Sequence, residues 1–182
     1  MSTRLNSKRA LAAAVCAALV VPAAAAAHPP SKDRPERPTP GELRKVFGAT
    51  KKFRDVKVAE RAGYEKASEC EKDPKYGAMG FHYANADLLA DGKLDIERPE
   101  ILVYQPTRSG KLRLGAVEYF QVDADQNLHT FEDRPSLFDL PFDGPMLGHN
   151  PQMPIHYDLH VWLYRHNPAG MFAAWNPNVR CP

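Results

Sequence analysis

Alternate residues in one segment of the sequence carry side chains that could bind a metal or move a proton. Between Ile155 and His166, every second position is polar or aromatic: His156, Asp158, His160, Trp162, Tyr164 and His166. The residues between them are apolar from Tyr157 to Leu163. Because β-strand side chains alternate between two faces, a strand here would turn one face to the hydrophobic core and line a polar cavity with the other.

Histidines and one glutamate form the strongest candidate ligand set: His82, Glu118, His156 and His160, with His149 in an adjoining loop. Imidazole nitrogen and carboxylate oxygen bind divalent transition metals, and two or three histidines with one glutamate would leave a coordination position open for water or substrate. We therefore expect a site for copper, zinc, iron or manganese, in a metalloenzyme or a metal-handling protein. An open position would favour an enzyme.

Two carboxylates, Asp158 and Glu118, are the candidate catalytic groups. Asp158 lies between two histidines of the predicted strand face, so it could hold a ring N–H and fix its tautomer, or form a His–Asp general base. Glu118 lies among apolar residues of another predicted strand, where an ionised carboxylate needs a cation, a metal or an exposed position.

Two other interpretations of the histidines remain open. They could line a metal-free pocket that binds a small molecule between the aromatic side chains of Tyr83, Trp162 and Tyr164. They could also be structural groups of a cell-envelope protein. The sequence contains no His-Glu-x-x-His motif, no phosphate-binding glycine loop and no Gly-x-Ser-x-Gly nucleophile elbow.

The first 27 residues are typical of a secretory signal. Arg4, Lys8 and Arg9 precede an apolar stretch that is too short to span a membrane, and Ala-x-Ala cleavage sites follow it. Residues 28–38 are rich in proline and predict a solvated linker, and residues 39–182 predict a single globular domain. We therefore expect a secreted, periplasmic or cell-surface protein.

Removal of this signal would change the formal net charge from +2 to −1, because residues 1–27 carry three basic and no acidic side chains. No basic tract with interleaved aromatic residues remains to indicate a nucleic-acid partner. No second apolar stretch is long enough to span a membrane. The expected partner is a metal ion or a small molecule.

Two of the three cysteines, Cys70 and Cys181, lie beyond the predicted signal. In an oxidising compartment an even pair of cysteines predicts one disulfide bond, and two unpaired cysteines are the alternative. Closing a loop of that length would stabilise the fold by about 4–5 kcal/mol at most.

The elements that must position these residues combine helix and strand. Thr39 and Glu42 form a capping-box pattern followed by apolar residues at three- and four-residue steps, which predicts helix from residue 40 to about 62, ending near Gly63. Besides 155–166, strands are expected at 79–84, 101–105, 112–122 and 171–175, with a hairpin turn at 107–110 and a long loop at 135–154.

One face of the predicted 112–122 strand carries Leu112, Leu114, Ala116, Glu118 and Phe120. The expected fold class is α+β, with the N-terminal helix packed on a curved antiparallel β-sheet or a small β-barrel. The polar histidine stripe would face the mouth of that sheet or barrel.

Several motifs resemble a group of uncharacterised secreted bacterial proteins that are common among high-GC actinobacteria and proteobacteria. They are GAMGFHY (77–83), VEY (117–119), GPM (144–146), YDLHVW (157–162), HNPAGMF (166–172) and WNPNV (175–179). The likeness covers most of the chain from Phe53 onward and implies that these segments form one unit. It implies no activity and no functional residue.

Overall fold

The structure, a computed structural model, describes residues 38–149 and 152–182. The predicted signal (1–27) and residues 28–37 of the predicted linker lie outside the described residues. Seven strands form an antiparallel sheet in the order β1-β3-β4-β5-β9-β8, with β2 also paired to β3, and β6 and β7 form a separate two-stranded sheet. The strands are β1 (Tyr64–Lys66), β2 (Glu71–Asp73), β3 (Gly77–Asn85), β4 (Ile101–Pro106), β5 (Leu112–Val122), β6 (Ser136–Leu137), β7 (Leu140–Pro141), β8 (Asp143–Met146) and β9 (His156–Val161).

The helical segments are α1 (Pro40–Thr50), the short 3-10 helix η1 (Lys51–Arg54), α2 (Val56–Arg61) and α3 (Ala86–Asp91). The predicted capping box begins α1: the Glu42 amide donates to Thr39 Oγ1 at 3.2 Å, and the Thr39 amide donates to the Glu42 carboxylate at 2.7 Å. The helical region ends at Gly63, whose φ is +90°. α3 was not predicted, although Asn85 caps it through the amides of Asp87 and Leu88.

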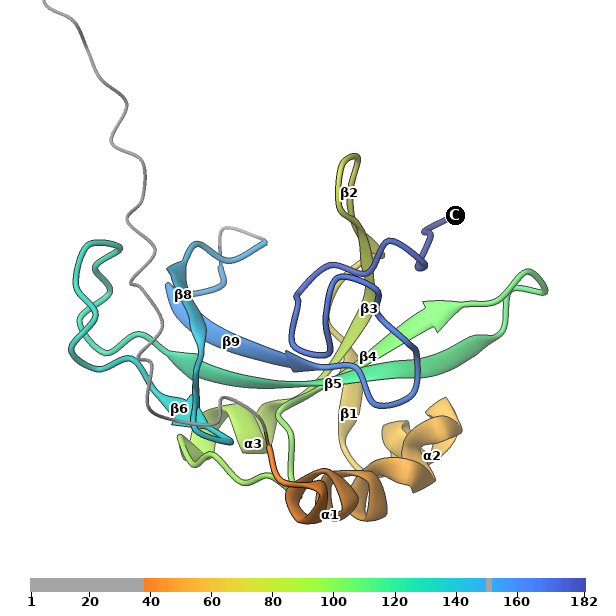
Figure 1. Cartoon of the computed structure of the whole chain (residues 1–182), viewed down its shortest axis with the longest axis horizontal. Coiled ribbons are helices and arrows are strands. Elements are labelled where there is room, and N and C mark those ends of the chain that lie inside the picture. The colour runs from red at the N-terminus through yellow and green to blue at the C-terminus, as the bar shows by residue number, and fades with distance from the viewer. Residues whose placement is uncertain (1–37, 150–151) are drawn as a thin grey trace, which may run out of the picture. The chain divides into compact units, whose positions relative to one another are not determined.

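The helices and the C-terminal segment lie on opposite sides of the main sheet, as Figure 1 shows. Val46, Phe53 and Ala59 from the helical region pack with Val117 and Leu159 of the sheet in one core. A second core contains residues of the other face together with Trp162 and Val179: Val103, Ala116 and Phe120. The sheet is therefore covered by apolar side chains on both faces, and a polar group on either face has to find partners inside the protein.

A β-bulge at Gly115 changes the face to which β5 presents its side chains. Val103 lies opposite Ala116 whereas Tyr104 lies opposite Leu114, so Gly115 is the additional residue on β5. Leu114 packs in the helix-side core and Ala116 packs in the second core. The prediction that all even-numbered residues of this strand share a face is thus wrong before Gly115, because one inserted residue reverses the alternation.

The prediction of an antiparallel sheet with packed helices is confirmed, but the alternative of a closed barrel is not. Among the described strands, β1 pairs with β3 and β8 pairs with β9, and no pairing joins the two outer strands to each other. Residues 171–175 form turns instead of the predicted strand, and the predicted loop at 135–154 contains three short strands. No described helix combines the length and apolar character that a membrane crossing needs.

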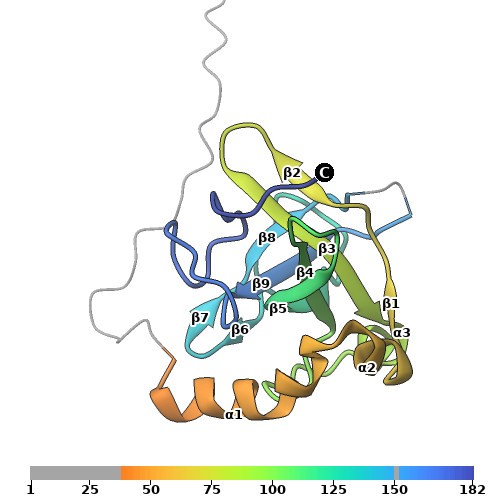
Figure 2. The same cartoon turned by 90° about the vertical axis from the view of Figure 1, so that its right-hand side faces the viewer.

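The predicted disulfide bond joins Cys70 to Cys181, which are 111 residues apart in the sequence. It ties the C-terminal segment to the segment that enters β2, and Figure 2 shows the two lying side by side. The bond therefore holds two chain segments at one edge of the sheet that are distant in sequence.

Candidate metal centre

Three strands bring His82, Glu118 and His160 together on one face of the sheet. Glu118 on β5 lies directly opposite His160 on β9. His82 on β3 is farther away, because β4 lies between β3 and β5 and places Val103 between His82 and Ala116 in the register. Neighbouring strands are about 4.8 Å apart, so His82 and Glu118 meet only because both side chains lean across β4 toward the same point.

The ligand atoms of this group converge on one carboxylate oxygen. Nε2 of His82 lies 3.2 Å from Oε2 of Glu118, and Nε2 of His160 lies 3.4 Å from the same oxygen. All three atoms are within 4.8 Å of one another. Ligands about 2.1 Å from a metal are about 3.0 Å apart in an octahedral site and about 3.4 Å apart in a tetrahedral one. The observed separations from Oε2 therefore match those of atoms that share a metal ion.

These polar atoms are buried without adequate partners. The side chains are nearly inaccessible, with 6% of His82, 3% of Glu118 and 0% of His160 exposed. Within the described residues, neither Oε2 of Glu118 nor either ring nitrogen of His160 has a partner with hydrogen-bond geometry. Leaving a buried polar atom unpaired costs about 1–3 kcal/mol, and more for a charged one. A cation bound among the three side chains would satisfy Oε2 of Glu118 and Nε2 of His160 at once.

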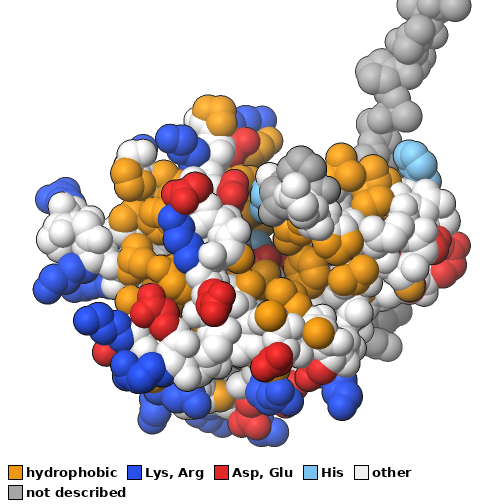
Figure 3. Space-filling view, turned by 180° about the vertical axis from the view of Figure 1, so that it is seen from behind, with side chains coloured by type: hydrophobic (Ala, Val, Ile, Leu, Met, Phe, Trp, Pro, Cys, Tyr) orange, Lys and Arg blue, Asp and Glu red, His pale blue; other side chains and the backbone are white. Residues whose placement is uncertain are grey.

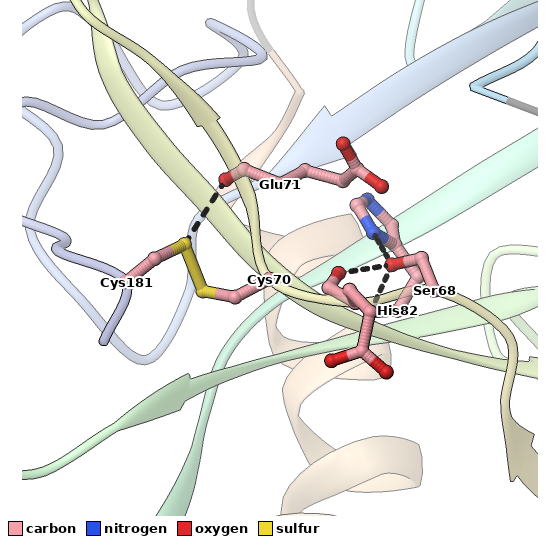
Figure 4. The surroundings of a disulfide bond; sticks show 6 residues. Ser68, Cys70, Glu71, His82 and Cys181 are labelled. Carbon is pink, nitrogen blue, oxygen red and sulfur yellow. Dashed lines mark hydrogen bonds between the residues drawn. A yellow bond between two sulfur atoms is a disulfide. The ribbon is translucent and has the colours of Figure 1, made fainter.

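Ser68 fixes the tautomer of His82. The Ser68 hydroxyl donates its only hydrogen to the carbonyl oxygen of Glu69 at 2.7 Å. Its Oγ also lies 2.9 Å from Nδ1 of His82 and accepts the His82 backbone N–H at 3.2 Å. Oγ is therefore the acceptor for an N–H at Nδ1, and Figure 4 shows the Ser68 oxygen beside the ring nitrogen of His82.

This tautomer leaves the other ring nitrogen of His82, Nε2, without a hydrogen. With the hydrogen at Nδ1, a neutral His82 turns the lone pair of Nε2 toward Oε2 of Glu118, which is also a lone-pair donor. Two such atoms repel each other at 3.2 Å unless a positive charge lies between them. A metal ion at the point where His160 also converges would supply that charge.

Asp158 has the corresponding position beside His160. Its Oδ1 lies 3.7 Å from Nδ1 of His160, on the other side of the ring from Glu118. Both histidines thus direct Nε2 to Glu118 and Nδ1 to an outer oxygen. In metal-binding histidines the outer oxygen accepts the Nδ1 hydrogen, which orients the ring and makes the ligating nitrogen more basic. Ser68 makes such a contact with His82 at 2.9 Å, whereas Asp158 at 3.7 Å is beyond hydrogen-bond distance of His160.

The carboxylates of the group stabilise positive charge on the histidines. Burial by itself would raise the pKa of Glu118, but the positive charges of His160 and His82 outweigh burial and lower that pKa to about 2. Burial by itself would lower the pKa of His160, but Glu118 and Asp158 outweigh it and raise that pKa to about 9. Asp143, opposite Asp158, has its pKa raised by burial and by the Asp158 charge. The carboxylates of Glu118, Asp158 and Asp143 thus stabilise positive charge at His160.

His149 and Glu71 lie close to the group and are partly exposed. Nδ1 of His149 lies 3.9 Å from Oε2 of Glu71, and their side chains are 33% and 26% exposed. The ring of His149 is 6.2 Å from that of His82. Figure 3 shows a hollow with histidine and acidic atoms at its floor and hydrophobic side chains around it. His149, which the sequence placed in an adjoining loop, thus lies beside the group and nearer the surface.

The remaining predicted site residues do not join the three ligands. His156 is buried on β9, the strand that carries His160. Its Nδ1 lies 3.0 Å from the Pro154 carbonyl oxygen, and its ring stacks on Phe120 at 4.6 Å. β9 ends at Val161, where the chain turns, so the predicted stripe stops after His160.

The three aromatic residues expected around a pocket are also separated. Trp162 packs in the second core and donates its Nε1–H to the Ala173 carbonyl at 2.7 Å. Tyr83 packs in the helix-side core, and only Tyr164 lines the cleft described below. Sequence reasoning did not identify Ser68, because it lies in an irregular segment with no periodic pattern.

Comparison of the chain with protein-family models, curated proteins and solved structures found no match. The resemblance to secreted bacterial proteins therefore stays a prediction, and a functional proposal depends on the site itself.

Proposed function

We propose that this is an exported protein that binds one divalent transition metal through Nε2 of His82, Oε2 of Glu118 and Nε2 of His160. The observation that carries the proposal is the convergence of two imidazole nitrogens on one buried carboxylate oxygen at 3.2 and 3.4 Å. The outer contact of Ser68 with Nδ1 of His82 supports it, since it leaves Nε2 of that ring available as a ligand.

The donor set narrows the choice of metal. Imidazole and carboxylate suit zinc, iron(II), manganese(II) and copper(II), whereas copper(I) prefers sulfur. Both Cys70 and Cys181 are consumed in the disulfide bond and offer no thiolate. Of copper, zinc, iron and manganese, the divalent ions therefore fit this centre.

Three protein ligands favour a reactive centre over a purely structural one. Structural zinc sites use four protein ligands, whereas catalytic sites use three and keep a position for water or substrate. A bound divalent ion would supply Lewis acidity and lower the pKa of a coordinated water. His149, whose side chain is partly exposed, lies beside the ring of His82 and is the nearest of these residues to the surface. Hydrolytic or oxidative chemistry and metal handling are all compatible with this arrangement.

Export is the second part of the proposal. The signal-like pattern of residues 1–27 and the Cys70–Cys181 disulfide support it, because disulfides persist in oxidising compartments. Mass spectrometry of the protein recovered from its native host tests this part. A mature N-terminus between residues 24 and 28 is expected, and an intact N-terminus on protein in the cytoplasm would contradict it.

Elemental analysis of protein purified without a histidine tag tests the metal centre. We expect near-stoichiometric metal in the natural chain and loss of that metal in His160→Gln. His156→Gln is the matched control, because His156 is equally buried on the same face of β9 but lies outside the group. Circular dichroism establishes that both variants are folded.

Two outcomes would overturn the proposal. One is absence of metal from the natural chain even after reconstitution with copper, zinc, iron and manganese. The other is equal metal in both variants. Either would leave the metal-free pocket with a His–Asp pair as the better account, and ligand screening would then be the next experiment.

A further inference from the structure

A cleft of about 1120 Å³ lies between the β4–β5 hairpin, η1 and the C-terminal segment, and none of the three candidate metal ligands lines it. Nine arginines occur between residues 38 and 182, and five of them line this cleft. They are Arg54, Arg108, Arg113, Arg165 and Arg180. These residues come from separate segments of the chain, so the fold, not a local run of charge, brings them together.

No acidic side chain among the described residues compensates the positive charge of this arginine cleft. No aspartate or glutamate side chain lines it. Among the described ion pairs, none joins one of its five arginines to a carboxylate. Residues 38–182 contain eighteen lysines and arginines against twenty aspartates and glutamates, so the cleft gathers positive charge in a region that is negative overall. Figure 3 shows blue side chains at the left, over the projecting end of the β4–β5 hairpin.

The cleft uses arginine alone among the basic residues. None of the nine lysines between residues 38 and 182 lines it. Lysine and arginine would serve equally well on a surface that only has to be soluble. A guanidinium, however, presents a planar pair of N–H groups that can bind two oxygens of one phosphate or carboxylate. The composition thus indicates recognition of oxyanions.

Parts of the cleft are held in place by other contacts. Nη2 of Arg165 donates to the carbonyl oxygen of Asn178 at 2.9 Å, which fixes that guanidinium and the C-terminal segment together. The Tyr164 hydroxyl lies 2.8 Å from Oγ1 of Thr50, and its ring stacks on Phe47 at 5.4 Å. Tyr164 therefore provides a fixed, partly apolar wall beside the arginines.

We propose that the arginine cleft binds a small molecule that carries two or more phosphate groups. Each bidentate contact engages one guanidinium with two oxygens of a phosphate, so five arginines around one cleft suit a ligand with more than one anionic group. The volume is in the range of small-molecule sites or slightly above it. The same chemistry occurs in a soluble oligophosphate and in the headgroup of a phospholipid with two phosphates.

Calorimetric titration with inorganic tripolyphosphate in about 0.15 M salt tests the proposal. Tripolyphosphate also binds divalent cations, so the protein is first treated with a chelator that is then dialysed away. We expect saturable binding with one molecule per chain. The double variant Arg113→Lys/Arg165→Lys keeps the charge but loses the planar donor pairs, and we expect its affinity to fall about tenfold or more.

The matched control is Arg44→Lys/Arg61→Lys, which changes two exposed arginines that do not line the cleft. It should bind tripolyphosphate as the natural chain does. Absence of saturable binding, or an equal loss in both double variants, would overturn the proposal, because the charge would then act without a defined site.

Sedimentation with cardiolipin-containing vesicles distinguishes the two sources of the phosphates. Binding to vesicles that tripolyphosphate displaces would assign a lipid headgroup, and tripolyphosphate binding without vesicle binding would assign a soluble ligand. Vesicle binding that is equally strong in Arg113→Lys/Arg165→Lys and that tripolyphosphate does not displace would count against the cleft as the site.

Discussion

Ser68 and His82 form a contact that defines the chemistry of the candidate metal centre: Oγ of Ser68 lies 2.9 Å from Nδ1 of His82, on the far side of the ring from Glu118. The serine hydrogen is directed to the Glu69 carbonyl, so Oγ is left as an acceptor. A residue two positions before Cys70 thus decides which nitrogen of His82 can bind a metal.

Ser68→Ala should weaken metal binding without unfolding the protein. The variant removes the acceptor for the N–H at Nδ1, so the ring of His82 is free to rotate or to change tautomer. Loss of such an outer contact typically reduces metal affinity about 10- to 100-fold. Competition with a chromophoric chelator measures the affinity. Ser109→Ala, in the exposed hairpin turn, is the control, and equal affinity in both variants would contradict the assignment of Ser68.

Removal of metal should lower the thermal stability of the natural chain but not that of Glu118→Gln. A ligand that binds only the folded state stabilises it. A free metal concentration 100 times the Kd contributes about 2.7 kcal/mol to the free energy of unfolding. The amide in Glu118→Gln keeps the shape of the side chain and removes its charge. Differential scanning calorimetry with and without chelator measures the shift. A chelator effect that persists in Glu118→Gln would show that metal binds elsewhere.

Glu100 should make the protein less stable as the pH rises from about 4.5 to about 7. Burial raises the pKa of this carboxyl to about 7, although the Phe120 amide donates to it at 3.1 Å. Between these pH values the folded state holds a proton that the unfolded state has released, so the free energy of unfolding falls as pH increases. The loss is at most about 3 kcal/mol and is complete above pH 7.

Glu100→Gln should lack this component of the pH dependence. The difference between the variant and the natural chain, measured by urea unfolding at pH 4.5, 6 and 7.5, isolates Glu100 from the other titrating groups. A constant difference across this range would refute the raised pKa.

Gly80→Ala should destabilise the sheet, whereas Gly48→Ala should not. Gly80 has a φ of +122°, and a Cβ there would overlap the carbonyl oxygen of Tyr104 on β4. A loss of about 2–4 kcal/mol is expected from the overlap and the strained backbone. Gly48 lies inside α1 with nothing within 4 Å of an added Cβ, so alanine there should stabilise by about 0.5–1 kcal/mol. Thermal unfolding of the two variants compares them directly.

The sequence was informative where structure depends on local periodicity. The capping box at Thr39 and the alternation of His156, Asp158 and His160 both depend on neighbouring residues, and both are present in the structure. Glu118 was expected to need a cation, a metal or an exposed position because of its apolar neighbours, and it is buried opposite His160. These predictions need only the period of a helix or a strand.

The sequence was uninformative where long-range contacts decide. The bulge at Gly115 reverses the alternation of side chains between the two faces of β5, and no local sequence pattern predicts it. The turn after Val161 removes Trp162 and Tyr164 from the histidine stripe. Ser68 becomes an outer partner only because β1 and β2 both pair with β3, which carries His82. The arginine cleft likewise exists only after folding.

The Cys70–Cys181 disulfide holds a segment of the candidate metal centre and a segment of the arginine cleft together. Cys70 follows Ser68 by two residues, and Cys181 directly follows Arg180 of the arginine cleft. Reduction of this single bond would free the segment that orients His82 and the segment that forms one wall of the cleft. A reducing environment would therefore weaken both sites together, and the protein would be fully competent only where thiols are kept oxidised.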